Sequence, residues 1–514
     1  MVFSGRQDSC RYIFRQTLRQ TRAVTVRVEK RLDNHQCPAQ PKIMESGRSL
    51  NSAPIRPSNH SRQLRRPFLR TLWWVPGILL AATTGPLPAA ETTGITAVRA
   101  ADFLDSIGTQ SAISVRGENF QKTIACAQYL GARWFRGGVE GNVPIEQFIK
   151  LHQQTGLRFS WGLGSGGTNI PKLIETGRLM AAAGALLAFE GPNEPNNWGF
   201  SYQGQAGGRD KSWLPVAKLQ SDLYSSVKSD PLLKNYPVWS ITEGGAEKDN
   251  VGLQFLTIPN GAGTLMPDGT QYADFANVHN YFYHPNAPGL EDNKTWNAAD
   301  PSAACKVDGL FGEYGVTWAH HYRGYSETEL ATLPRVTTET GTTIGGPVTE
   351  EIHALNLLSL FLDQFKRGWS YTCVYLLRDR VDEAGNQQFG YYRPDYSPRP
   401  AAVYLHNLTT ILADNGALSK PDKLDYSILD KPATVHDLLL QKSDSSFALA
   451  VWSELVNGTN NVQVNLGGTY ATIKIYDPTT GTMPIQTNRA INSLTLGLSN
   501  HPLVIAIPAN SREQ

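Results

Sequence analysis

The sequence predicts an α/β protein, a (β/α)8 TIM barrel followed by a C-terminal antiparallel β-sandwich. From Ala101 onward, short apolar runs alternate with amphipathic segments of helix length, which is typical of repeated βα units. After Asn415-Gly416 the helical period disappears, and short alternating strands separated by turn residues replace it. The 514 residues, 40% of them hydrophobic, are enough for a barrel core and a smaller module.

The N-terminal 90 residues are expected to lie outside the barrel. Residues 1–64 are rich in Arg, Gln and Ser without hydrophobic periodicity, which predicts a disordered or overlong extension. In residues 65–90, a basic segment with paired arginines precedes the apolar run Leu72–Ala82 and a small-residue cleavage point at Ala89-Ala90. This order is typical of an export signal and resembles the twin-arginine type, so we expect a periplasmic or secreted protein. An uncleaved anchor is the alternative, although this run is short for a bilayer span.

Charge and cysteine content narrow the classes of partner. The 47 basic and 45 acidic residues leave a net charge of +2, which gives no reason to expect nucleic acid as a partner. The cysteines are too scattered for a zinc site or a dense disulfide framework. They are Cys10, Cys37, Cys126, Cys305 and Cys373.

The barrel, expected over residues 91–414, is assigned from apolar or β-branched runs that stop at Gly, Pro or polar residues, each followed by a segment of period 3.6. The second strand stops before Gly137-Gly138, the fourth at a Gly/Pro segment, and the seventh at Gly341. In order, the expected strands are Ser111–Val115, Ala132–Arg136, Arg158–Gly162, Ala185–Phe189, Pro237–Thr242, Phe275–Tyr281, Arg335–Thr340 and Ser370–Leu377. The expected helices are Phe120–Leu130, Ile145–Thr155, Ile170–Ala183, Leu214–Ser229, Val348–Lys366 and Pro400–Leu412.

Residues 415–514 are expected to form the β-sandwich. Turn residues such as Asn457-Gly458 and Gly467-Gly468 separate strands that alternate with period 2. We interpret this module as structural support, with carbohydrate binding as the alternative. Its expected strands are Val435–Gln441, Phe447–Trp452, Asn461–Asn465, Thr472–Tyr476, Ser493–Leu498 and Leu503–Ile507.

Two glutamates follow apolar strands and are the candidate catalytic pair. The fourth strand leads into Asn193-Glu194-Pro195, and the seventh ends at Glu339. In a (β/α)8 barrel the active site is built at the carboxyl ends of the strands, so both side chains are expected at the same opening. Each also has a structural interpretation, Glu194 as part of a polar turn and Glu339 as an exposed acid that caps a loop. Glu243 is a supporting candidate, and Glu190 has no assigned role.

Other polar and aromatic residues at strand ends are expected to bind substrate. Arg136 ends the second strand, while His279 and Tyr281 share one face of the sixth by period-2 alternation. Aromatic faces suit stacking against sugars. The expected substrate-binding residues are therefore Asn193, Arg136, His279, Tyr281, Trp161, Trp198 and Tyr375.

Taken together, these residues resemble the clan A glycoside hydrolases, which are retaining (β/α)8 enzymes. The segment from Asp274 to Tyr281 looks most like the β-xylosidase and α-L-iduronidase family of that clan. The resemblance implies Glu194 as general acid/base, Glu339 as nucleophile and Asn193 as a partner of the sugar 2-hydroxyl. It further implies that Tyr281 donates to the nucleophile, with His279 and Arg136 holding the pair. The sequence departs from the family in lacking a Trp after Glu339 and on the eighth strand.

The expected reaction is hydrolysis of an O-glycosidic bond of an oligo- or polysaccharide through a covalent glycosyl-enzyme intermediate. Such an enzyme needs one protonated and one ionised carboxyl group about 5–5.5 Å apart, and it needs no metal or organic cofactor. The alternatives are a non-catalytic glycan-binding barrel and a transglycosylase that uses the same intermediate.

Overall fold

The structure is a computed structural model that describes residues 94–139, 143–209, 211–242, 255–282, 294–300, 328, 332–382, 388–414, 416–418, 420–455 and 457–509. The expected N-terminal extension and export signal, Glu243, and most of the loop after the sixth strand lie outside these residues. Within the described residues, no helix is both long and apolar enough to cross a membrane.

Eight parallel strands form the barrel, in the order β10-β11-β12-β3-β4-β5-β6-β9. The ring closes between β9 and β10, where Trp239 forms a parallel bridge with Phe275 and the Ser240 amide donates to the Phe275 carbonyl at 3.0 Å. The strands are β3 (Ile107–Gln110), β4 (Trp134–Gly138), β5 (Arg158–Ser165), β6 (Leu186–Asn193), β9 (Val238–Trp239), β10 (Ala276–His279), β11 (Arg335–Thr340) and β12 (Trp369–Val374).

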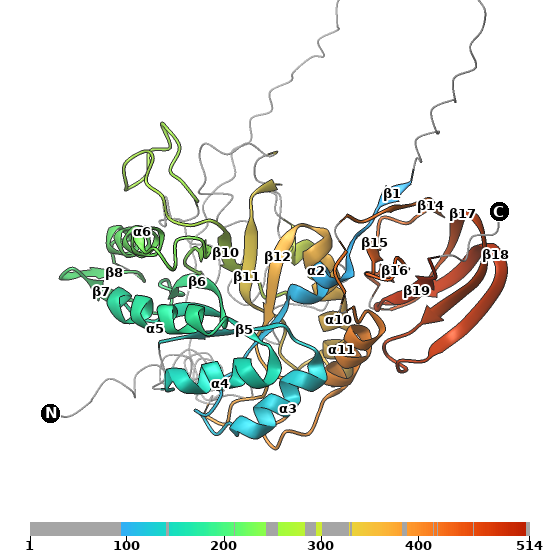
Figure 1. Cartoon of the computed structure of the whole chain (residues 1–514), viewed down its shortest axis with the longest axis horizontal. Coiled ribbons are helices and arrows are strands. Elements are labelled where there is room, and N and C mark those ends of the chain that lie inside the picture. The colour runs from blue at the N-terminus through green and yellow to red at the C-terminus, as the bar shows by residue number, and fades with distance from the viewer. Residues whose placement is uncertain are drawn as a thin grey trace, which may run out of the picture. The chain divides into compact units, whose positions relative to one another are not determined.

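Helices surround these strands (Figure 1). Three of them begin at a polar cap, since the side chains of Asn119, Asn169 and Thr349 accept from backbone amides of the first turn. Gly131 ends its helix in the left-handed conformation that glycine adopts without strain. The helices are α2 (Ala100–Asp105), α3 (Phe120–Leu130), α4 (Ile145–Thr155), α5 (Ile170–Ala182), α6 (Leu214–Ser229), α7 (Lys294–Ala298), α10 (Glu350–Lys366) and α11 (Pro400–Ile411).

An apolar layer forms a floor inside the barrel. Trp134 and Trp239 are fully buried with ring centroids 5.5 Å apart, and Val336 and Cys373 belong to the same cluster. Arg136 lies two residues after Trp134 on β4, so it shares the inward face one step closer to the carboxyl end. The inward-facing layer between this apolar floor and the carboxyl ends of the strands is therefore open to polar side chains.

The first barrel strand was wrongly placed by sequence. It is β3 (Ile107–Gln110), whereas Ser111–Val115 forms a turn. Ile113 has a φ of 59°, and the Glu118 carboxylate accepts from the Ser111 hydroxyl at 2.5 Å and the Ala112 amide at 3.1 Å. The Glu118 side chain thus accepts a backbone hydrogen that a neighbouring strand would otherwise have accepted. An alternating apolar pattern in the sequence does not reveal such an acceptor. The expected fifth strand, Pro237–Thr242, is shortened to Val238–Trp239.

The C-terminal module is an antiparallel β-sandwich. Its strand order is β14-β17-β19-β16-β15-β2, and β18 pairs with β17. The expected strands Asn461–Asn465 and Thr472–Tyr476 are two parts of the single strand β17, whose register shifts between Asn465 and Tyr470. The strands are β13 (Lys423–Leu424), β14 (Tyr426–Leu429), β15 (Val435–Gln441), β16 (Phe447–Ser453), β17 (Asn460–Tyr476), β18 (Pro484–Leu498) and β19 (Leu503–Ile507).

Two strands that precede the barrel in sequence belong to this module. β1 (Ile95–Thr96) pairs with β13, and β2 (Val98–Arg99) adds in parallel to β15. Buried contacts also join barrel helix α10 to the sandwich. The Trp452 indole donates to the Asp363 carboxyl at 2.8 Å, and both side chains are buried.

Candidate active site

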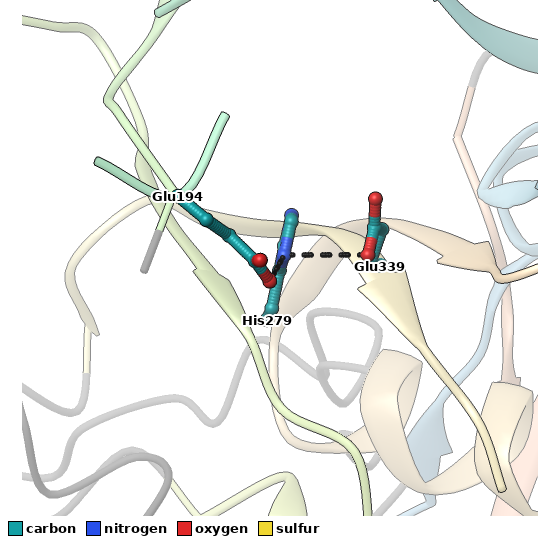
Figure 2. A group of neighbouring side chains, drawn as sticks. All are labelled: Glu194, His279 and Glu339. Carbon is teal, nitrogen blue, oxygen red and sulfur yellow. Dashed lines mark hydrogen bonds and ion pairs between the residues drawn. The ribbon is translucent and has the colours of Figure 1, made fainter. Parts of the chain in front are cut away.

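The two glutamates meet at the carboxyl ends of the barrel strands. Glu194 directly follows β6 and Glu339 lies near the end of β11. Between them lies His279, the last residue of β10, with Nδ1 2.7 Å from Glu194 Oε1 and 3.5 Å from Glu339 Oε2 (Figure 2). Carboxyl oxygens of the two glutamates lie within 4.8 Å of each other. This separation fits the carboxyl spacing of retaining rather than inverting glycosidases.

Glu194 is buried and held in an uncommon backbone conformation. Its φ is 40°, a region that non-glycine residues seldom occupy and that recurs at functional sites. The Asn197 amide donates to Glu194 Oε2 at 2.9 Å, and the Trp198 side chain also hydrogen-bonds this carboxyl group. Burial nevertheless raises the pKa of Glu194, because removal from water disfavours the ionised form more than these donors favour it.

Glu339 has stronger electrostatic support for its charge. Arg136 Nη1 lies 2.5 Å from Glu339 Oε1, and the Tyr281 hydroxyl donates to Oε2 at 2.8 Å. Burial raises the pKa of Glu339, against the opposing effects of His279, Arg136 and the Tyr281 hydrogen bond. Of Glu194 and Glu339, Glu339 alone is hydrogen-bonded to a guanidinium, so when this pair holds one proton that proton belongs on Glu194.

Arg136 is the electrostatic centre of the site. Its guanidinium also donates to Glu190 Oε1 at 2.6 and 2.9 Å and to Asn193 Oδ1 at 2.8 Å. Burial opposes its charge, but the carboxylates of Glu190 and Glu339 outweigh that effect and raise the pKa of Arg136. One cation thus orders two buried carboxylates and the amide of Asn193.

His279 and Tyr281 remain uncharged at neutral pH. Burial lowers the pKa of His279 to about 4, in spite of the nearby carboxylate of Glu339. Burial and the same carboxylate raise the pKa of Tyr281 well above its usual value. Both therefore act as neutral hydrogen-bonding groups between or beside the glutamates.

Asn193 and the three remaining aromatic candidates, Trp161, Trp198 and Tyr375, are placed in four different ways. The Asn193 side chain is held by Arg136 and donates to Ser165 Oγ at 3.1 Å. Trp198 contacts Glu194 as described, and Tyr375 lines a pocket beside Arg136. Trp161 was wrongly expected in the site. It is 2% exposed, packs edge-on against Phe148 of α4 and donates to Thr176 of α5.

Trp161 fails as a site residue because strand residues alternate between the two faces of the barrel wall. Trp161 points toward the helices, while its neighbour Ser160 points inward and donates to Glu190 Oε2 at 3.3 Å.

Sequence reasoning missed the roles of Glu190, Thr338 and Asn197. Glu190 is 1% exposed and accepts from Arg136, Ser160 and Thr338. One signal was present in the sequence. A charged residue within the buried strand Leu186–Asn193 requires a buried partner, and Arg136 was already a candidate.

Glu194, His279 and Glu339 also offer three possible metal-ligand atoms within 4.8 Å of one another. The guanidinium of Arg136 already supplies a positive charge to Glu339, and Tyr281 donates to its other oxygen. Repulsion between the guanidinium and a cation makes this trio better suited to a neutral organic substrate than to a metal ion.

Comparisons with known proteins provide evidence on the fold alone. Neither a protein-family model nor a curated protein sequence matches the chain. Among solved structures, CelM2, a bifunctional glucanase-xylanase from a metagenome library, is 11% identical with a TM-score of 0.50 over 80% of this chain and 97% of that chain. At this identity the similarity concerns the barrel architecture.

Two further structures are similar just below that TM-score. A family 39 glycoside hydrolase from Bacteroides cellulosilyticus WH2 is 14% identical, with a TM-score of 0.49 over 79% of this chain and 82% of that chain. The GH51 arabinofuranosidase from Xanthomonas axonopodis pv. citri is 11% identical, with a TM-score of 0.47 over 82% and 96%.

Proposed function

We propose that this protein is a retaining glycoside hydrolase of the clan A type, acting on O-glycosidic bonds of an oligo- or polysaccharide. The observation that carries the proposal is the pair of buried carboxyl groups within 4.8 Å at the ends of β6 and β11. Their surroundings differ, because of these two glutamates only Glu339 forms an ion pair with the guanidinium of Arg136 among the described residues. Retaining glycosidases require such a pair, with one member protonated and the other ionised.

The proposed mechanism has two steps. Glu339 attacks the anomeric carbon while Glu194 gives its proton to the leaving oxygen, so that a glycosyl ester forms and an alcohol departs. Glu194, now a carboxylate, then takes a proton from water as that water attacks the anomeric carbon and releases Glu339. The resemblance to clan A enzymes assigns Asn193 as the partner of the sugar 2-hydroxyl, and the guanidinium of Arg136 bonds the side chains of both Asn193 and Glu339.

Within the clan, we propose that the enzyme is most similar in its sugar specificity to the β-xylosidase and α-L-iduronidase family. This proposal rests on the sequence segment Asp274–Tyr281, which resembles that family. Export to the periplasm or medium fits a polysaccharide substrate and is proposed from residues 65–90 alone.

Trapping with a panel of 2-fluoro glycosides tests the function. A retaining enzyme accumulates a covalent adduct, and peptide mapping should locate the label on Glu339. The sugar that labels fastest identifies the glycone. Labelling elsewhere, or none across the panel, contradicts the proposal. Binding of the same sugars without turnover indicates the glycan-binding alternative, and transfer of the glycosyl group to an added acceptor sugar indicates a transglycosylase.

A further inference from the structure

A chain of hydrogen bonds connects the buried carboxylate of Glu190 to the acid/base candidate. Glu190 Oε1 lies 2.9 Å from the Thr338 hydroxyl, which lies 3.2 Å from His279 Nε2. On the other side of the ring, His279 Nδ1 lies 2.7 Å from Glu194 Oε1. All four side chains are at least nine-tenths buried, so donors and acceptors must be matched without water.

The direction of this chain follows from counting hydrogens. Thr338 has one hydroxyl hydrogen, and its possible acceptors are Glu190 Oε1 at 2.9 Å, His279 Nε2 at 3.2 Å and Asn277 Oδ1 at 3.3 Å. The carboxylate is nearer and charged, so it takes the hydrogen. The Asn277 amide nitrogen, 3.1 Å from the same hydroxyl, donates to it instead. The Thr338 oxygen is then an acceptor toward His279.

His279 consequently carries its hydrogen on Nε2. Because burial keeps the imidazole neutral, with a pKa of about 4, the ring has one N–H, and Thr338 is its acceptor. The Nδ1 lone pair then faces Glu194 Oε1 at 2.7 Å. Two acceptors at this distance repel each other, and a proton on Glu194 converts that repulsion into a hydrogen bond.

The geometry points to Glu190 and Thr338 as positioning residues that fix the tautomer of His279 and thereby hold the proton on Glu194. The inference rests on the proposed function and explains how its acid, Glu194, is kept protonated. No proton moves along the chain. In the first step the proton passes from Glu194 to the leaving oxygen, and repulsion from the Nδ1 lone pair of His279 then makes the Glu194 carboxylate a stronger base toward water.

The remaining charged and titratable groups around the ring do not reverse this direction. Glu339 Oε2, 3.5 Å from Nδ1, is another acceptor and already receives the Tyr281 hydroxyl. Arg136, from β4, donates to Glu190 and Glu339. The other donors to Glu194, Asn197 and Trp198, bond the carboxyl group in either protonation state.

The test replaces Thr338 with Val, which removes the hydroxyl at nearly constant shape, and with Ser, which keeps it. One hydrogen bond of about 0.5–1.5 kcal/mol corresponds to roughly 0.5–1 pKa unit. We expect Thr338→Val to lower the pKa of Glu194 by this amount, because His279 then donates from Nδ1, and Thr338→Ser to restore it. Thr340→Val is the matched control, since Thr340 is equally buried on the same strand and donates to the Asn280 carbonyl.

Two readouts report this pKa. The basic limb of the pH profile of kcat/KM reports it kinetically for the free enzyme, and 13C NMR titration of the Glu194 carboxyl measures it without substrate. The His279 tautomer is read by 15N NMR, assigned with a His279→Gln variant. Since the NMR readouts need no turnover, absence of hydrolysis refutes the proposed function without deciding this inference. An Nδ1–H tautomer in the unmodified protein overturns it, as does an equal pKa in Thr338→Val and Thr340→Val.

Discussion

Replacing Arg136 with Met should destabilise the fold and make its stability strongly dependent on pH. The side chain is 8% exposed and lies 2.5–2.9 Å from oxygens of Glu339, Glu190 and Asn193. Its removal leaves two buried carboxylates without a cation, and breaking one buried pair costs about 3–5 kcal/mol. At about 2.1 cal/mol/K per residue, the roughly 350 described residues convert this cost into a fall of about 4–7 °C in Tm.

The assay is thermal unfolding followed by circular dichroism between pH 4.5 and pH 7.5. Burial already raises the pKa of Glu339 in the folded state, and loss of Arg136 raises it further, because the Arg136 charge opposes that effect of burial. A raised carboxyl pKa means that stability falls as pH increases from the unfolded pKa toward the folded one. The deficit of Arg136→Met should therefore be small at pH 4.5 and largest at pH 7.5.

Two further variants make the interpretation specific. The double variant Arg136→Met/Glu190→Gln should be about 1–3 kcal/mol more stable than the sum of the single effects predicts, since it removes one of the stranded charges. Lys172→Met is the control, because Lys172 pairs with Glu175, the two side chains are 53% and 66% exposed, and exposed pairs contribute less than about 1 kcal/mol. A loss below about 1 kcal/mol at pH 7.5, or additive single effects, refutes the reasoning.

Three other predictions concern single carboxyl groups. Glu339→Gln should abolish hydrolysis and leave the circular dichroism spectrum unchanged; substantial turnover by the purified variant contradicts its role as nucleophile. Glu194→Gln should lower kcat by about 10²–10⁴-fold for alkyl glycosides and far less for a dinitrophenyl glycoside, whose leaving group needs no proton in the first step; equal losses contradict an acid. Burial raises the pKa of Asp363 to about 7, so stability should fall as pH rises from about 4 through 7, and Asp363→Asn should raise Tm at pH 8 but not at pH 5; an unchanged Tm difference between these pH values contradicts this assignment.

The order of barrel elements was accessible from the sequence because each element must bury one face. Helices Phe120–Leu130, Ile145–Thr155 and Leu214–Ser229 begin and end at the predicted residues. Their period of 3.6 is a local property, and local polar caps and Gly residues mark several ends. The first barrel strand was misplaced because the turn at Ser111–Val115 depends on Glu118, whose side chain satisfies its backbone.

Residues at strand ends were identified in part. Period 2 determines which residues share a face, but not which face is inward. Arg136 and His279 were assigned to the barrel opening, where the structure places them beside the glutamates, while Trp161 belongs to the layer beneath the helices. The pairing of β2 with β15 joins segments more than 300 residues apart, and no local pattern indicates it.

The sequence by itself determined the repeated βα pattern, the C-terminal β-rich module and the presence of two glutamates where strands end, because hydrophobic period and turn chemistry are properties of neighbouring residues. Only the tertiary structure decided that Glu190 is the partner of Arg136 and that Thr338 connects Glu190 to His279. Barrel closure brings these side chains from four strands into one buried layer, and in that layer each charge and each hydrogen must find its partner among residues that lie far apart along the chain.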